Sequence, residues 1–136
     1  MSLSGLMMAA ASIMGIQAVA AQPAQAAACI AFDNLRSWSA TAFRGTSASP
    51  TYTTTRNCRD INFGWAETST SQAPIGNVRV CFVRAGTCNT WKRYNGDTAA
   101  LEIVIASNVS DGTTYRVEFL WNESVYGSRF GFRAYA

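Results

Sequence analysis

The clearest structural signal in the chain is the segment Thr114-Tyr-Arg-Val-Glu-Phe-Leu-Trp121. Tyr, Val, Phe and Trp occupy every second position, and the positions between them include Arg116 and Glu118. Because successive side chains of a strand point to opposite faces of a sheet, this alternation predicts a half-buried β-strand. Segments 77–84 and 129–134 alternate in the same way. The pattern therefore predicts a core built from strands that each have one apolar face.

Most of the remaining chain after residue 28 is also typical of strands. Short runs rich in Val, Ile, Phe, Tyr, Trp and Thr are separated by Gly, Asn, Asp and Ser, and no stretch shows the apolar spacing of a helix. The predicted strands cover residues 30–32, 37–44, 60–66, 77–84, 101–107, 114–121 and 129–134. They predict an all-β fold, a small antiparallel β-sandwich of about seven strands, with a small barrel as the alternative.

Two connecting segments carry predictions of their own. The turn residues Ser110-Asp111-Gly112 stand between strands 101–107 and 114–121, a spacing that predicts an antiparallel hairpin. Segment 39–56 is dominated by Ala, Ser and Thr, which favours a strand at a sheet edge followed by a loop. An extended or O-glycosylated linker is the alternative for that segment.

The N-terminal stretch has the pattern of a secretory signal. No charged side chain precedes Asp33, and residues 6–16 are apolar apart from one serine. The small residues that follow include Ala24-Gln25-Ala26, which matches a signal cleavage site, although the usual basic n-region is absent. We therefore expect a signal peptide over residues 1–26 and a secreted, extracellular domain over residues 27–136. A buried helix and a retained membrane anchor are the alternatives.

All cysteines lie in the predicted secreted domain. Their number is even, and an exported protein matures in an oxidising compartment, so Cys29, Cys58, Cys81 and Cys88 predict two disulfides. Three pairings are possible, and we expect the sequential one, Cys29–Cys58 and Cys81–Cys88. The larger loop of the first bridge should contribute more, about 3 kcal/mol in the chain-entropy model. Lipidation of Cys29 is the alternative that would remove this bridge.

The composition argues against catalysis. The chain has no histidine, which is the commonest general base and metal ligand, and Lys92 is its only lysine. The eight carboxylates show no spacing that selects a catalytic pair, and the cysteines lack zinc-site spacing. We therefore expect no enzyme activity, no catalytic residue, no cofactor and no metal.

One loop combines aromatic and basic side chains. Trp91, Lys92, Arg93 and Tyr94 follow one another directly, and such groups stack on sugar rings or anchor protein interfaces. The alternative is structural, with Trp91 packed over the 81–88 loop while Lys92 and Arg93 face solvent.

The start of the predicted secreted domain is a second candidate contact. It is rich in small residues and includes Ala27, Ala28 and Ile30. An extended segment of this kind can add a strand to the sheet of a partner protein. The alternative is that it forms the first strand of its own sheet.

The charge pattern limits the kind of partner. The net charge is +3 and the arginines are scattered along the chain, which favours neither nucleic-acid binding nor, after signal removal, a membrane role. The partner we expect is an extracellular protein or a surface glycan. The sequence thus predicts a secreted, non-catalytic binding protein, first of all a protein–protein adaptor or a structural component of an extracellular assembly. A carbohydrate- or cell-wall-binding module and an enzyme inhibitor that presents the 81–88 loop are the alternatives.

Four short motifs carry a resemblance to known proteins. They are Arg56-Asn-Cys-Arg-Asp-Ile-Asn62, Val78-Arg-Val-Cys-Phe82, Thr87-Cys-Asn-Thr-Trp-Lys92 and Asp111-Gly-Thr-Thr-Tyr-Arg116. Together with the predicted signal peptide, they resemble small secreted disulfide-bonded β-proteins of actinomycetes. The general plan is also similar to the adaptor subunit of secreted umbrella toxin particles, which links a lectin subunit to a scaffold subunit. This resemblance implies a protein–protein adaptor role and assigns no binding residue.

Overall fold

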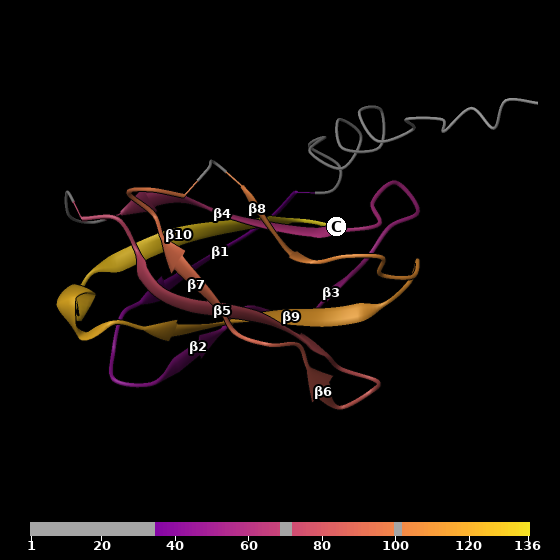
Figure 1. Cartoon of the computed structure of the whole chain (residues 1–136), viewed down its shortest axis with the longest axis horizontal. Coiled ribbons are helices and arrows are strands. Elements are labelled where there is room, and N and C mark those ends of the chain that lie inside the picture. The colour runs from indigo at the N-terminus through magenta and orange to yellow at the C-terminus, as the bar shows by residue number, and fades with distance from the viewer. Residues whose placement is uncertain (1–34, 69–71, 100–101) are drawn as a thin grey trace, which may run out of the picture.

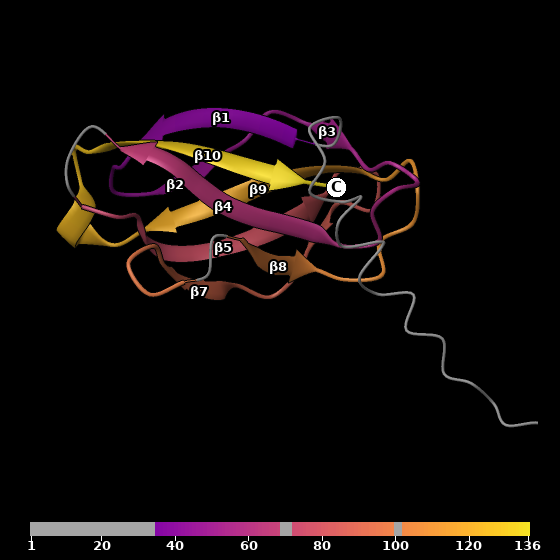
Figure 2. The same ribbon diagram turned by 90° about the horizontal axis from the view of Figure 1, so that it is seen from above.

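In the computed structural model, which describes residues 35–68, 72–99 and 102–136, the chain forms two antiparallel β-sheets that pack face to face (Figures 1 and 2). The four-stranded sheet contains, in spatial order, β1 (Leu35–Thr41), β10 (Arg129–Tyr135), β4 (Ile61–Thr68) and β8 (Ile103–Ala106). The six-stranded sheet contains β2 (Thr46–Ala48), β9 (Thr114–Trp121), β5 (Ile75–Phe82) and β6 (Thr87–Cys88), with β3 (Tyr52–Thr53) also paired to β9 and β7 (Lys92–Asn95) to β5. The prediction of an all-β fold with antiparallel sheets is confirmed.

Aromatic side chains from both sheets form the core. The ring of Phe132 lies 5.3 Å from that of Phe63 in its own sheet and 5.3 Å from that of Phe119 in the opposite sheet. Trp121 and Phe130 also stack across the two sheets, with ring centroids 5.3 Å apart. These five side chains are at most 4% exposed. Burying each of them stabilises the fold by about 1.5–3 kcal/mol.

The strand with the clearest alternation is found where it was predicted. Strand β9 spans Thr114–Trp121, and its inward side chains are buried, namely Tyr115, Val117, Phe119 and Trp121. Strand β10 and strand β5 likewise bury the apolar faces that the sequence predicts. A 3-10 turn, η2 (Glu123–Val125), is the only helical element in the described ranges, and among these residues no helix has the length and hydropathy to cross a membrane.

The predicted hairpin around Ser110-Asp111-Gly112 is wrong. Strand β8 pairs with β4 in one sheet and β9 pairs with β5 in the other, so this loop crosses between the sheets. The loop is held in this crossing position by hydrogen bonds to Thr54, which belongs to the segment between β3 and β4. Thr54 Oγ1 donates to Ser110 O at 2.8 Å, and the N–H of Thr113 donates to Thr54 Oγ1 at 2.9 Å.

Segment 39–56 runs along the edges of both sheets, as a strand and loop rather than a linker. It ends β1 and then supplies β2 and β3, which both pair with β9. Between them the buried Ser49 continues the pairing, since its N–H donates to Val117 O at 2.8 Å. Ser49 Oγ accepts from Val117 N at 2.8 Å and donates to Pro50 O at 2.7 Å. The predicted strand-and-loop interpretation is confirmed.

One predicted disulfide is present. Cys81 and Cys88 are bonded to each other and join the neighbouring strands β5 and β6. Cys58 is 1% exposed, and no described cysteine carries a free thiol. Its predicted partner, Cys29, lies outside the described residues, so the Cys29–Cys58 bridge stays a prediction. The signal peptide (1–26), strand 30–32 and the candidate residues Ala27, Ala28 and Ile30 also lie outside them.

Candidate functional site

The outer face of the six-stranded sheet carries a cluster of charged side chains. Glu118 stands directly opposite Arg79 in the β5–β9 register, and Arg116 stands opposite Cys81. The neighbours of these residues along each strand, Val80 and Val117 among others, are buried in the core. Since side chains alternate, the charged groups point away from the core, toward solvent.

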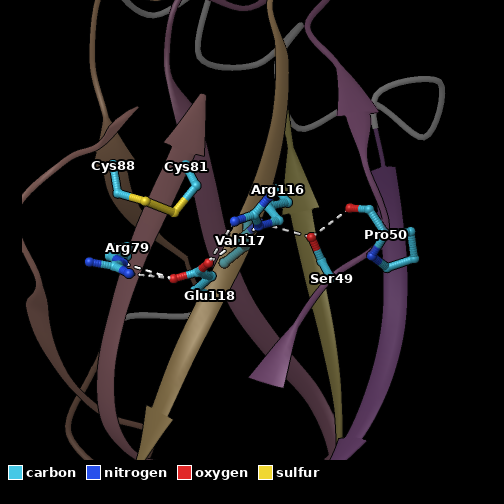
Figure 3. A network of polar contacts seen from close by, with 8 residues as sticks. All are labelled: Ser49, Pro50, Arg79, Cys81, Cys88, Arg116, Val117 and Glu118. Atoms are coloured by element: carbon cyan, nitrogen blue, oxygen red, sulfur yellow. Dashed lines mark hydrogen bonds and ion pairs between the residues drawn. A yellow bond between two sulfur atoms is a disulfide. The ribbon is translucent and has the colours of Figure 1, made fainter. Parts of the chain in front are cut away.

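Glu118 holds the two arginines in place (Figure 3). Arg79 Nη2 lies 2.7 Å from Glu118 Oε2, and Arg116 Nη2 lies 3.1 Å from Glu118 Oε1. The Nε atoms of Arg79 and Arg116 donate to the same two oxygens at 2.8 and 3.2 Å. Burial raises the pKa of Glu118, but hydrogen bonds and charge from Arg79 and Arg116 outweigh it, so the pKa lies below the ordinary value of 4.5. Glu118 is therefore ionised at neutral pH.

Trp91 belongs to the same face. Its ring packs against the guanidinium of Arg79, whose Cζ atom lies 4.1 Å from the ring centroid. Such a cation–π contact contributes about 0.5–1 kcal/mol at an exposed site. The ring is partly exposed, and the adjacent Arg93 is exposed. Trp91 therefore lies beside Arg79, a neighbour that the sequence did not reveal, and its role as a binding residue stays a prediction.

The other two residues of the predicted aromatic and basic loop have structural contacts. Tyr94 is 1% exposed and packs edge-on against Phe63 at 5.0 Å between ring centroids, so its prediction as a surface contact is wrong. The reason is strand β7, which the sequence did not predict and which turns Tyr94 inward. Burial raises the pKa of Tyr94 to about 12. Lys92 is exposed, but its Nζ donates to Val104 O at 2.8 Å and ties β7 to β8.

The cluster contains a set of potential metal ligands whose chemistry is wrong for a metal. The sulfur atoms of Cys81 and Cys88 and a carboxylate oxygen of Glu118 lie within 4.8 Å of one another. Both sulfur atoms belong to a disulfide, whereas metal ions bind the thiolate form of cysteine. These residues are therefore better described as part of a charged surface than as a metal centre.

An open cavity lies at one end of the two sheets. It has a volume of about 440 Å³ and is lined by the turn after β5 and the loop between β8 and β9. Arg84 and Asp111 are its charged side chains, while Phe82 and Val109 form part of its apolar wall. The two segments meet because the end of β5 pairs with the start of β9, with Phe82 opposite Tyr115, and the sequence does not reveal this pairing.

Among the described strands, β1 is the outermost on one side of the four-stranded sheet. In an antiparallel pair, alternate residues hydrogen-bond to the neighbouring strand and the others point their backbone groups away from it. Ala42 N donates to Ser128 O at 2.8 Å, which assigns the even-numbered residues to the β10 side. The backbone groups of Ser37 and Ser39 therefore point away from β10. Accordingly, Tyr52 Oη reaches Ser37 O at 3.5 Å from the other side.

Two features of the described residues thus have the groups needed for binding, the charged cluster on the six-stranded sheet and the edge of β1. Comparison with protein-family models, with curated proteins and with solved structures finds no match. The resemblance to actinomycete β-proteins and to the umbrella-particle adaptor stays a prediction.

Proposed function

We propose that the protein is a secreted, non-catalytic binding protein that acts as a protein–protein adaptor or a structural component of an extracellular assembly. In this proposal residues 1–26 are a signal peptide and residues 27–136 form the secreted domain, a β-sandwich closed by the bridges Cys29–Cys58 and Cys81–Cys88. The observation that supports the adaptor role is the edge of strand β1.

The edge of β1 lacks several of the devices that usually prevent strand addition, although it carries one charged residue, Arg36. Native sheets protect their edges with lysines, prolines, bulges or short edge strands. Strand β1 has seven residues, contains no Lys or Pro, and pairs with β10 in one continuous register. Its exposed side chains Ser37, Ser39 and Thr41 are small and uncharged. A strand from another protein can therefore approach the part of this edge formed by Ser39 and Thr41, whereas Tyr52 already contacts Ser37 O.

Strand addition would use the main chain for affinity. The N–H of Ser37 and the N–H and C=O groups of Ser39 and Thr41 face the incoming strand, and each hydrogen bond formed contributes about 0.5–1.5 kcal/mol net. The segment with Ala27, Ala28 and Ile30 lies a few residues before this strand in the sequence and is the second proposed contact. Both contacts would then join the same end of the chain to a partner.

A proline scan of the edge tests the proposal. In Ser37→Pro only an N–H that faces away from β10 is lost, so the fold should persist while strand addition is blocked. Ser37→Ala keeps that N–H and serves as the matched control. We expect affinity purification from the culture medium to recover stoichiometric protein partners with the wild type and Ser37→Ala, and much less with Ser37→Pro.

Deletion of residues 27–32 tests the second contact in the same purification. Thermal unfolding followed by circular dichroism should show that Ser37→Pro is still folded. Recovery of the wild-type protein alone, or equal partner yields for Ser37→Pro and Ser37→Ala together with an unaffected deletion variant, would refute the adaptor proposal.

A further inference from the structure

Three arginines lie in a diagonal line across neighbouring strands of the six-stranded sheet. Arg93 on β7 stands opposite Asn77 of β5, and Arg116 on β9 stands opposite Cys81 of β5. Arg79 lies midway between these two positions on β5. Each step of the line therefore crosses one strand and moves two residues along it. With strands about 4.8 Å apart and about 3.4 Å per residue, the arginines follow one another at intervals of about 8 Å.

The three arginines point to the same side of the sheet. The residue that follows Arg93 is the buried Tyr94, and those that follow Arg79 and Arg116 are buried valines. Alternation along each strand therefore sends all three guanidinium groups to the outer face. We call this set, together with Trp91, the arginine array.

The array keeps a positive charge and a fixed geometry. Glu118 neutralises one of the three positive charges, and it engages Arg79 and Arg116 through their Nε and Nη2 atoms. A guanidinium has further N–H donors on Nη1, and the side chains of Arg79 and Arg116 are 30% and 42% exposed. Arg93 is exposed. Glu118 thus holds Arg79 and Arg116 in fixed orientations before a ligand binds. The face still has a net positive charge and attracts an anion.

Strands β5 and β9, which carry Arg79 and Arg116, offer side chains but no sheet edge, whereas β7, which carries Arg93, is paired on one side only among the described residues. Strand β5 is paired with β9 on one side and with β6 and β7 on the other, and β9 is paired with β2, β3 and β5. A peptide lying across these strands would find no main-chain groups to pair with. A sugar polymer with acidic substituents would need none, because guanidinium groups bind such substituents and an indole ring packs against the apolar face of a sugar ring.

We propose that the arginine array binds a linear acidic polysaccharide, with Arg93, Arg79 and Arg116 contacting successive acidic groups and Trp91 contacting a sugar ring. This site does not rest on the adaptor proposal, because β1 belongs to the other sheet. It also differs from the loop predicted from the sequence, since Tyr94 is buried and two of the three arginines come from β5 and β9.

Isothermal titration of the secreted domain with polygalacturonate and with dextran sulfate tests this site. We expect binding to at least one of these polymers that weakens with salt, and none to neutral dextran. Arg93→Ala should lower the affinity about tenfold, which corresponds to the loss of one charge-assisted contact, and Trp91→Ala should lower it by a similar factor through the loss of its contact with a sugar ring. Arg56→Ala is the matched control, because it removes an equally exposed arginine in the loop between β3 and β4.

Poly-L-glutamate is the comparison that separates a sugar site from a surface that attracts any polyanion. It should bind at least tenfold more weakly than the preferred polysaccharide. The proposal is overturned if neither acidic polysaccharide binds, if poly-L-glutamate binds equally well, or if Arg56→Ala weakens binding as much as Arg93→Ala. Because Arg93 is exposed, its substitution should leave the unfolding temperature unchanged, which keeps the result interpretable.

Discussion

Glu118 illustrates how one residue can organise a surface. Its side chain is only 11% exposed, yet both of its oxygens accept hydrogen bonds from arginines on two different strands. Burying a carboxylate is unfavourable unless it is paired, and here the pairing is complete on both oxygens. The residue therefore stabilises the sheet and positions the arginine array at the same time.

Replacing this carboxylate should cost stability. We expect Glu118→Gln to lower the free energy of unfolding by about 1–2 kcal/mol at pH 7, because both arginines lose a charged acceptor. Chemical denaturation measures the change. Glu123→Gln, an exposed glutamate in η2, is the control and should stay within about 0.5 kcal/mol of the wild type. Equal effects of the two substitutions would mean that the ion pairs contribute nothing specific.

Because the pKa of Glu118 is lowered in the folded protein, the stability that its ion pairs contribute depends on pH. A carboxyl group with a lowered pKa in the folded state stabilises the protein above its unfolded pKa, and this contribution disappears as the pH falls through the folded value. The difference in stability between the wild type and Glu118→Gln should therefore be largest near neutrality and shrink below pH 4.5. A difference that stays constant down to acidic pH would show that the ion pairs are not its origin.

At the scale of elements, strands β5 and β9 can pack closely because position 76 is a glycine. A Cβ atom at Gly76 would lie 2.6 Å from Phe119 Cε1 and would collide with the carbonyl oxygen of Leu120. Because that oxygen belongs to the paired strand, the collision can be relieved only by moving β9. We expect Gly76→Ala to destabilise the protein by more than about 2 kcal/mol.

Gly86 provides the matched comparison for this substitution. It lies in the turn after β5 with φ +66°, and a Cβ there would meet no atom within 4 Å. Gly86→Ala should therefore cost only the conformational strain of about 1 kcal/mol. Thermal unfolding of both variants tests the order, and a Gly86→Ala protein that is the less stable of the two would contradict this account of β5–β9 packing.

The sequence predicts the strands that carry their own alternation and misses those that depend on a neighbour. Strand β9 is predicted to the residue because its apolar positions repeat without interruption. Strands β2, β3 and β6 have two or three residues each, too few for a period to show, and they form by pairing with β9 or β5. The same limit applies to the site, since the diagonal of arginines depends on the register between strands.

At the scale of the whole molecule, both the aromatic core and disulfide bonding contribute to the stability of the fold. The core draws on every long strand of both sheets, so the fold should survive the loss of one small covalent loop. The Cys81–Cys88 bridge closes a loop with a sequence separation of 7 and should contribute about 2.5 kcal/mol in the chain-entropy model. The predicted Cys29–Cys58 bridge would close a larger loop and contribute more.

This difference leads to a test of the second bridge. A variant with Cys81→Ala and Cys88→Ala should remain folded and lose about 2.5 kcal/mol of unfolding free energy. If Cys29 and Cys58 are bonded, treating that variant with a thiol reductant should lower its unfolding free energy by about a further 3 kcal/mol. Breaking this bond frees a larger loop in the unfolded chain, and the unfolded state gains conformational entropy. Denaturation curves with and without reductant measure both steps. A variant whose stability is insensitive to the reductant would contradict the Cys29–Cys58 pairing, and would leave the burial of Cys58 against Tyr135 and Leu35 as its whole contribution to the fold.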